Sequence, residues 1–168
     1  MTNKNKTVWS NRFKNSTSKS FQRIGASISI DKRLYKQDIF ASKIHTQMLV
    51  KNKIIPAKDG AKIIKGLDKI KKLIDSGKFI FKEKFEDIHL NIEKKLYEIT
   101  GNSAAYMHTA RSRNDQVVTD FKLWVKESTL LIIQELNLLM KNIVNTAEKN
   151  IGTIMPGFTH LKNAQPIS

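Results

Sequence analysis

The sequence has no cysteine, and its 168 residues include only three prolines and seven glycines. The lack of cysteine excludes disulfide bonds, thiolate metal sites and a cysteine nucleophile. The scarcity of glycine and proline favours long helices. The longest apolar runs, such as Leu130 to Ile133, are far shorter than the about 20 residues of a membrane-spanning helix. Residues 1–15 are polar and lack the apolar core of a signal peptide. We therefore expect a cytoplasmic protein.

Acidic side chains are scarce in the first half of the chain. The sequence has 30 Lys and Arg against 15 Asp and Glu, a net charge of +15. Residues 1–82 hold 20 basic and 5 acidic side chains, whereas residues 83–168 hold ten of each. Such asymmetry is typical of nucleic-acid-binding proteins. However, Lys outnumbers Arg 25 to 5, and lysine lacks the bidentate fork of arginine. We interpret the excess as a solvated lysine-rich surface, with a basic helical nucleic-acid-binding module as an alternative.

The apolar residues recur at helical spacing. This spacing predicts helices over residues 34–53, 56–77 and 86–100. Proline at position 56 suits the first turn of the second helix, and glycine at position 101 suits the C-terminal cap of the third. Residues 1–32 show no sustained period and are predicted to be an irregular arm. Residues 102–113 are predicted to form a polar loop.

The longest predicted helix runs from Asp115 to Asn150, without glycine or proline. Ser112 and Asp115 match the capping-box pattern at its start. Its second half is apolar nearly all round, so it must be buried on several sides, which the preceding helices cannot achieve. Gln165-Pro166 resembles the first turn of a further helix. We expect an incomplete all-α protein, with a small N-terminal domain over residues 1–112 and the start of a central helical bundle over 113–168.

Three polar clusters lie at the predicted element boundaries, where functional groups are common. They cover residues 26–31, 108–116 and 155–166. The second cluster places two guanidinium groups at a helix N-terminus, an arrangement suited to an anion. Alternatively, its serine and aspartate only cap the helix and the arginines are solvated. His160 follows a Pro-Gly turn and is a candidate acid or base, or a structural histidine. The four histidines are scattered, so we predict no metal site.

Residues 108–116, His-Thr-Ala-Arg-Ser-Arg-Asn-Asp-Gln, closely resemble the His-Thr-Gly-Arg-Ser-Arg-Asn-Asp-Gln segment of the argininosuccinate lyase family. Other motifs are similar to that family's in the same order: Trp9 with Arg12-Phe13, Ala-Ser-Ile at 26–28, Glu-Asp-Ile-His at 86–89 and Met-Pro-Gly-Phe-Thr-His-Leu at 155–161. Thr-His followed by Gln-Pro also marks the wider fumarase/aspartase superfamily. Ala110 replaces the family's glycine, a costly change if that position has a positive φ.

The resemblance implies an all-α homotetramer without cofactor, acting on the small molecule argininosuccinate in arginine biosynthesis. The reaction is a reversible β-elimination that yields arginine and fumarate. The implied catalytic acid/base is His160, and the implied substrate-binding residues are Ser27, Asn114 and Thr159, to which we add Arg113, with Arg111 and Asp87 as supporting groups. The family's active sites combine three subunits, and a later loop supplies a serine and a lysine that this chain lacks. We therefore expect this chain alone to be inactive and to aggregate. A non-catalytic lyase-type remnant is the alternative.

Overall fold

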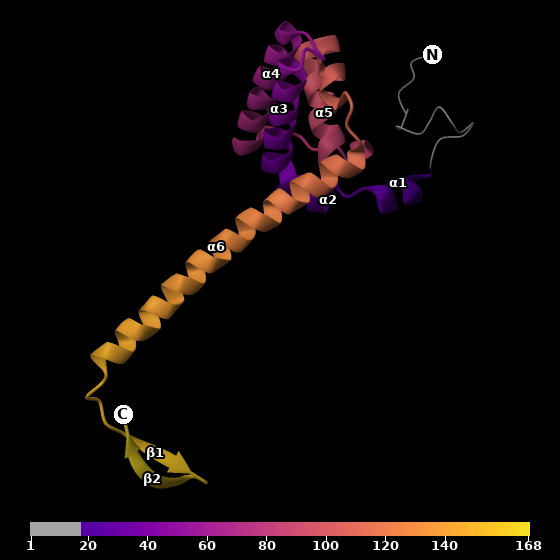
Figure 1. Cartoon of the computed structure of the whole chain (residues 1–168). Helices are drawn as coiled ribbons and strands as arrows, with labels where there is room; N and C mark the ends of the chain where they lie inside the picture. Colours follow the sequence, from indigo (N-terminus) through magenta and orange to yellow (C-terminus); the bar gives the residue numbers. More distant parts are fainter. Residues whose placement is uncertain (1–17) are drawn as a thin grey trace. The chain divides into compact units, whose positions relative to one another are not determined.

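The computed structural model describes residues 18–168 (Figure 1). The motif around Trp9 and Arg12-Phe13 lies outside these residues. The described part is helical apart from one two-stranded sheet, so the expected helical fold is confirmed. The chain divides into two compact units, one ending at Trp124 and one covering Val125–Ser168. Each unit is described by itself below. Within the described residues, the helices are too short or too polar to cross a membrane.

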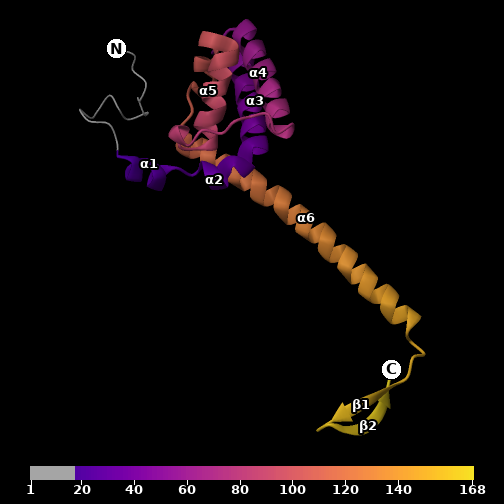
Figure 2. The same ribbon diagram turned by 180° about the vertical axis from the view of Figure 1, so that it is seen from behind.

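Three helices build the core of the first unit and match the predicted ones. They are α3 (Tyr35–Lys51), α4 (Ala57–Asp75) and α5 (Ile88–Thr100), which lie side by side in Figures 1 and 2. Gly101 has a φ of 61° and ends α5 as predicted. Each fully buried Leu or Ile contributes about 1.5–3 kcal/mol. The core between the three helices comprises Ile39, Leu49, Ile63, Leu67, Ile70, Ile88, Ile92 and Leu96.

Two predictions of irregular structure are wrong. The described end of the expected arm forms α1 (Lys19–Gly25), α2 (Ile28–Asp31) and the 3₁₀ helix η1 (Lys32–Leu34). The expected polar loop begins with the 3₁₀ helix η3 (Gly101–His108), which buries Ala104 and Met107 against α4 and α5. A further 3₁₀ turn, η2 (Glu83–Phe85), precedes α5. These elements are only three to eight residues long, which is too short to show a hydrophobic period.

Helix α6 (Arg113–Lys149) confirms the long helix predicted from the sequence. In the second unit its apolar side chains are exposed, from 40% at Val125 to 62% at Leu131. Strands β1 (Met155–Thr159) and β2 (Lys162–Ile167) follow it as an antiparallel pair. The helix expected at Gln165-Pro166 is therefore wrong. A residue before proline avoids the helical conformation, and the β2 backbone pairs with β1 instead.

Candidate functional site

Arg113 is the first residue of α6 and is held by three side chains. Its Nη2 lies 3.1 Å from Oε2 of Glu93 in α5, and its Nη1 donates to Oε1 of Gln116 at 2.8 Å. Its Nε lies 3.9 Å from Oδ2 of Asp87, whose other oxygen accepts the N–H of Leu90 at 2.6 Å and caps α5. The Arg113 side chain is only 32% exposed. This arginine is thus bound to protein groups, rather than solvated as one reading of the sequence allowed.

Ser27, which precedes α2, joins the same region. Its backbone N–H donates to the carbonyl of Glu86 at 2.9 Å. Its hydroxyl donates to Oδ2 of Asp31 at 2.5 Å, and Oδ1 of Asp31 accepts the N–H of Ile88 at 3.2 Å. Burial raises the pKa of Asp31 above its usual value. The structure therefore brings the Ser27 segment to the start of α5, where Arg113 also makes its contacts.

The loop before α6 fixes Asn114. The hydroxyl of Ser112 accepts the N–H of Asn114 at 3.2 Å, which confirms the hydroxyl half of the predicted cap. The side chain of Asn114 is exposed and makes no hydrogen bond within residues 18–168. Arg111 donates to the hydroxyl of Ser42 in α3 at 2.9 Å. Ala110 has a φ of 53°, so this position does require the conformation that favours glycine.

Thr159 and His160 lie in the second unit, at the tip of the β1–β2 hairpin. Thr159 pairs with Lys162, and the two residues between them, His160 and Leu161, have φ values of 47° and 64°. Two successive positive φ values are typical of a type I′ turn, which usually takes Asn and Gly. Thr159 and His160 are both exposed. A histidine in a strained turn is a pattern seen at functional sites. The predicted site residues thus fall into two groups, one in each unit.

A buried polar cluster in the first unit was missed by the sequence analysis. It consists of Asp38 in α3, His89 in α5 and Asp120 in α6, each at most 1% exposed. His89 Nδ1 lies 3.1 Å from Oδ1 of Asp38 and 3.4 Å from Oδ2 of Asp120. Gln116 donates to Oδ1 of Asp38 at 2.5 Å. Burial, aided by the charge of Asp38, raises the pKa of Asp120 to about 8. One ligand atom from each of the three lies within 4.8 Å of the others, close enough to hold a metal ion.

Sequence spacing could not reveal this cluster, because its members come from three separate helices. The available signal was the occurrence of charged residues within amphipathic helices. Asp38 directly precedes the core residue Ile39, and His89 directly follows the core residue Ile88. Buried charges are rare unless they are paired, so such positions are candidates for tertiary pairing.

Comparison with known proteins identifies the family. The family model described as lyase matches residues 11–168. The chain belongs to the lyase family. The argininosuccinate lyase of Pelagibacter ubique (strain HTCC1062) is 53% identical to it over 164 residues, covering 98% of this chain and 36% of that protein. The argininosuccinate lyase of Ehrlichia canis (strain Jake) is 50% identical over 161 residues, covering 96% of this chain and 34% of that protein. That of Symbiobacterium thermophilum is 45% identical over 160 residues, covering 95% and 35%.

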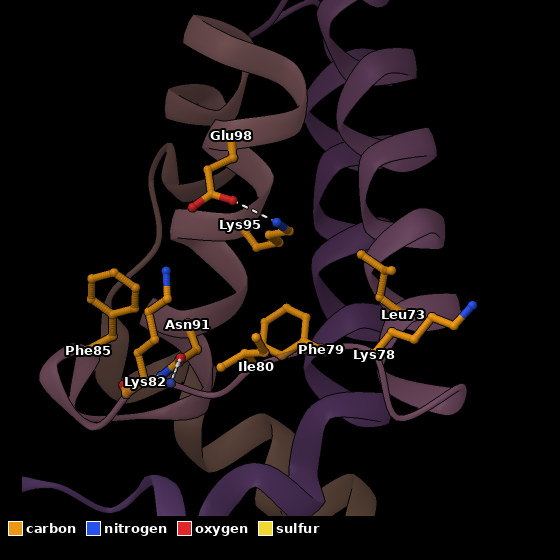
Figure 3. Close-up of a pocket in the computed structure, with 9 residues that line it drawn as sticks. All are labelled: Leu73, Lys78, Phe79, Ile80, Lys82, Phe85, Asn91, Lys95 and Glu98. Carbon is orange, nitrogen blue, oxygen red and sulfur yellow. Dashed lines mark hydrogen bonds and ion pairs between the residues drawn. The ribbon is translucent and has the colours of Figure 1, made fainter.

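The resemblance inferred from the motifs is thus confirmed for this member of the lyase family. The chain spans about a third of the length of the curated relatives it matches. A pocket of about 190 Å³ in the first unit lies elsewhere, between α4, α5 and the segment joining them (Figure 3). At its rim Lys95 pairs with Glu98 at 2.7 Å. None of the five predicted site residues lines it. The predicted site residues of the first unit, Ser27, Arg113 and Asn114, thus lie near the starts of α5 and α6, away from this pocket.

Proposed function

We propose that this chain carries part of the active site of an argininosuccinate lyase, which converts argininosuccinate reversibly into arginine and fumarate. Relatives of that name match 95–98% of the chain at 45–53% identity. The observation that carries the proposal is the meeting of three separate motifs at one place. The Ser27 segment, the Asp87 cap and the Arg113-Asn114 turn are joined by hydrogen bonds and ion pairs at the starts of α5 and α6.

The chemistry requires donors for a developing negative charge. Elimination takes the proton from a carbon beside a carboxylate and breaks the bond from the neighbouring carbon to the guanidino nitrogen of arginine. Proton removal places a second negative charge on that carboxylate, so donors aimed at it lower the barrier most. In the proposal, the hydroxyl of Ser27 turns from Asp31 to the substrate's carboxylates, which the hydroxyl of Thr159 and the amide of Asn114 also bind. The amide of Asn114 is exposed and has no hydrogen-bond partner in the described part of the chain, which supports this role.

Arg113 is proposed to bind substrate while held in place by its neighbours. Nη1 and Nη2 each carry a second hydrogen beyond the bonds to Gln116 and Glu93. An arginine offers a carboxylate a bidentate pair of donors. Asp87 and Glu93 balance its charge, and Gln116 fixes its direction. We assign Asp87 a supporting role, because it caps α5 and lies 3.9 Å from the guanidinium.

His160 is proposed to be the group that moves a proton. Its imidazole is exposed at the hairpin tip, and an imidazole can both accept and donate a proton in catalysis. A complete elimination needs both an acid and a base in reach of the substrate. We propose that the second group comes from protein elements beyond this chain, in a cytoplasmic homotetramer whose sites combine several subunits. Residues 1–112 would then form the N-terminal lyase domain, and residues 113–168 the start of the central helical bundle. The exposed apolar side chains of α6 after Val125 support such an assembly, because a helix that is apolar nearly all round is normally buried.

An elimination assay tests the proposal. The complete gene product is incubated with argininosuccinate and, separately, with adenylosuccinate, and fumarate is followed by its absorbance. His160→Asn removes the imidazole, and asparagine tolerates the positive φ of the turn. We expect activity on argininosuccinate alone, lowered by about 10²–10⁴-fold in His160→Asn. The control Leu161→Asn, in the same turn, is expected to retain activity. A folded protein without activity on either substrate would refute the proposed function.

A further inference from the structure

We infer that Asp38, His89 and Asp120 form a proton-sharing triad that holds the first turns of α6 against α3 and α5 and so positions Arg113. The geometry of the first unit supports both the triad and its additional proton. The consequence for substrate binding rests on the proposed function. The three residues are positioning residues, because they act on Arg113 through the side chain of Gln116.

One ring nitrogen of His89 faces both carboxylates. Its Nδ1 is hydrogen-bonded to Oδ1 of Asp38 at 3.1 Å and lies 3.4 Å from Oδ2 of Asp120, an ion-pair contact without a hydrogen bond. The three side chains come from α5, α3 and α6 and are at most 1% exposed. Water therefore cannot compensate their charges, and the protein itself must supply the donors.

The triad has fewer hydrogen-bond donors than buried carboxylate oxygens, so it needs an additional proton. Among the described residues, Oδ2 of Asp38 and both oxygens of Asp120 are buried without a hydrogen-bond partner when both carboxylates are ionised. Two adjacent buried carboxylates cannot both ionise readily, and protonation of one supplies a donor to the other. A protonated Asp120 can donate to the Asp38 carboxylate. The triad then holds Asp38 as the anion, His89 as the cation and Asp120 as the neutral acid.

The electrostatic surroundings favour this distribution. Burial and the charge of Asp38 raise the pKa of Asp120 to about 8. Burial alone would raise the pKa of Asp38 and lower that of His89, but their mutual hydrogen bond and charges shift the two pKa values the opposite way. The other charged groups that face the triad are Asp31 near the end of α2, Asp87 before α5 and Arg111 before α6. Carboxylates thus outnumber cations, which favours retention of the extra proton.

Gln116 connects the triad to the candidate site. Its amide nitrogen donates to Asp38 at 2.5 Å, and its amide oxygen accepts from Arg113 at 2.8 Å. Gln116 is 1% exposed, so these are the contacts available to it within the described part of the chain. His89 also lies two residues after Asp87, one of the two carboxylates that pair with Arg113. Loss of the shared proton therefore disturbs Arg113 from two directions.

The test is the pH dependence of unfolding of the whole chain in urea, followed by circular dichroism. Between pH 5 and 6 the folded chain keeps the Asp120 proton that the unfolded chain has lost, because an ordinary Asp pKa is near ~3.9. Because the folded chain holds one proton more than the unfolded chain, each increase of one pH unit raises the unfolding equilibrium constant about tenfold. Asp120→Asn keeps a donor toward Asp38 but cannot ionise. We expect the unfolding equilibrium constant of this variant to lack that tenfold rise per pH unit. We also expect the variant to be more stable than the wild type at pH 9.

Two further variants keep the result interpretable. Asp68→Asn, at a half-exposed site paired with Lys43, is the matched control and should keep the wild-type slope. Asp38→Asn removes the anion beside His89, and we expect it to destabilise the chain more at pH 5 than at pH 9. In NMR spectra, the Arg113 Nε–H signal should shift between pH 6 and 9 in the wild type and shift less in Asp120→Asn, where residue 120 no longer ionises.

Two results would overturn the inference. One is an unchanged slope in Asp120→Asn together with an Arg113 signal that does not respond to pH. The other is a wild type that Zn²⁺ stabilises and a chelator destabilises, which would make the cluster a metal site. Neither readout needs enzymatic activity. A lack of elimination activity would therefore refute the proposed function and leave the decision about the triad to the unfolding and NMR measurements.

Discussion

Replacing Gln116 by methionine should uncouple the start of α6 from the buried triad while nearly preserving side-chain volume. Both ends of the glutamine amide bond to charged groups, at 2.5 Å to Asp38 and 2.8 Å from Arg113. Hydrogen bonds to charged groups contribute about 1.5–3 kcal/mol each. Methionine recovers part of this loss as an apolar side chain. We therefore expect the free energy of unfolding to fall by about 3 kcal/mol, a large share of the about 5–15 kcal/mol of a typical domain.

The assay is urea unfolding of the whole chain at pH 7, followed by circular dichroism. With a typical slope of about 1–3 kcal/mol per molar urea, the midpoint should fall by about 1–3 M. Gln47→Met, the same change at an exposed position of α3, is the control and should leave the midpoint unchanged. A loss below about 1 kcal/mol for Gln116→Met would show that the amide does not connect the two charged groups, and would refute the reasoning.

Three further predictions concern the loop, the site and the assembly. Because residue 110 has a φ of 53°, Ala110→Gly should stabilise the chain by about 0.5–1 kcal/mol in urea unfolding. The control Ala105→Gly, in η3, should destabilise the chain by a similar amount. Arg113→Lys should raise KM for argininosuccinate about tenfold, because lysine cannot bind a carboxylate bidentately; an unchanged KM would remove this residue from the substrate site. Leu131→Lys with Leu138→Lys should shift the chain toward the monomer in sedimentation experiments, because both leucines are more than half exposed on α6. Unchanged sedimentation would argue against burial of this surface between copies.

Much of the helical framework could be predicted from the sequence. The three core helices and α6 have long hydrophobic periods, so their existence and approximate limits follow from local patterns. Asp87 and Gly101 sit at the ends of α5, as their capping preferences suggest. The short 3₁₀ and α elements and the β hairpin were not predicted. A few residues carry too little local preference, and the neighbouring chain decides their conformation.

The candidate site was predicted in its parts but not in its connections. Ser27, Asn114 and Arg113 were selected because their segments match family motifs. The hydrogen bonds from Ser27 through Asp31 to the start of α5 depend on the packing of distant segments. The roles of Ser27, Asn114, Thr159, Arg113 and His160 toward a substrate stay predictions until the assays above are done.

The sequence by itself determined where the long helices run and which family the motifs indicate, because periodicity and caps act between residues a few positions apart. Only the tertiary structure decided that α3, α5 and α6 bring Asp38, His89 and Asp120 together away from water. Burial and mutual proximity perturb the pKa values of such groups, and both depend on contacts between residues about 30 to 80 positions apart in the chain. A shared proton is therefore a property of the folded chain, which no local pattern reveals.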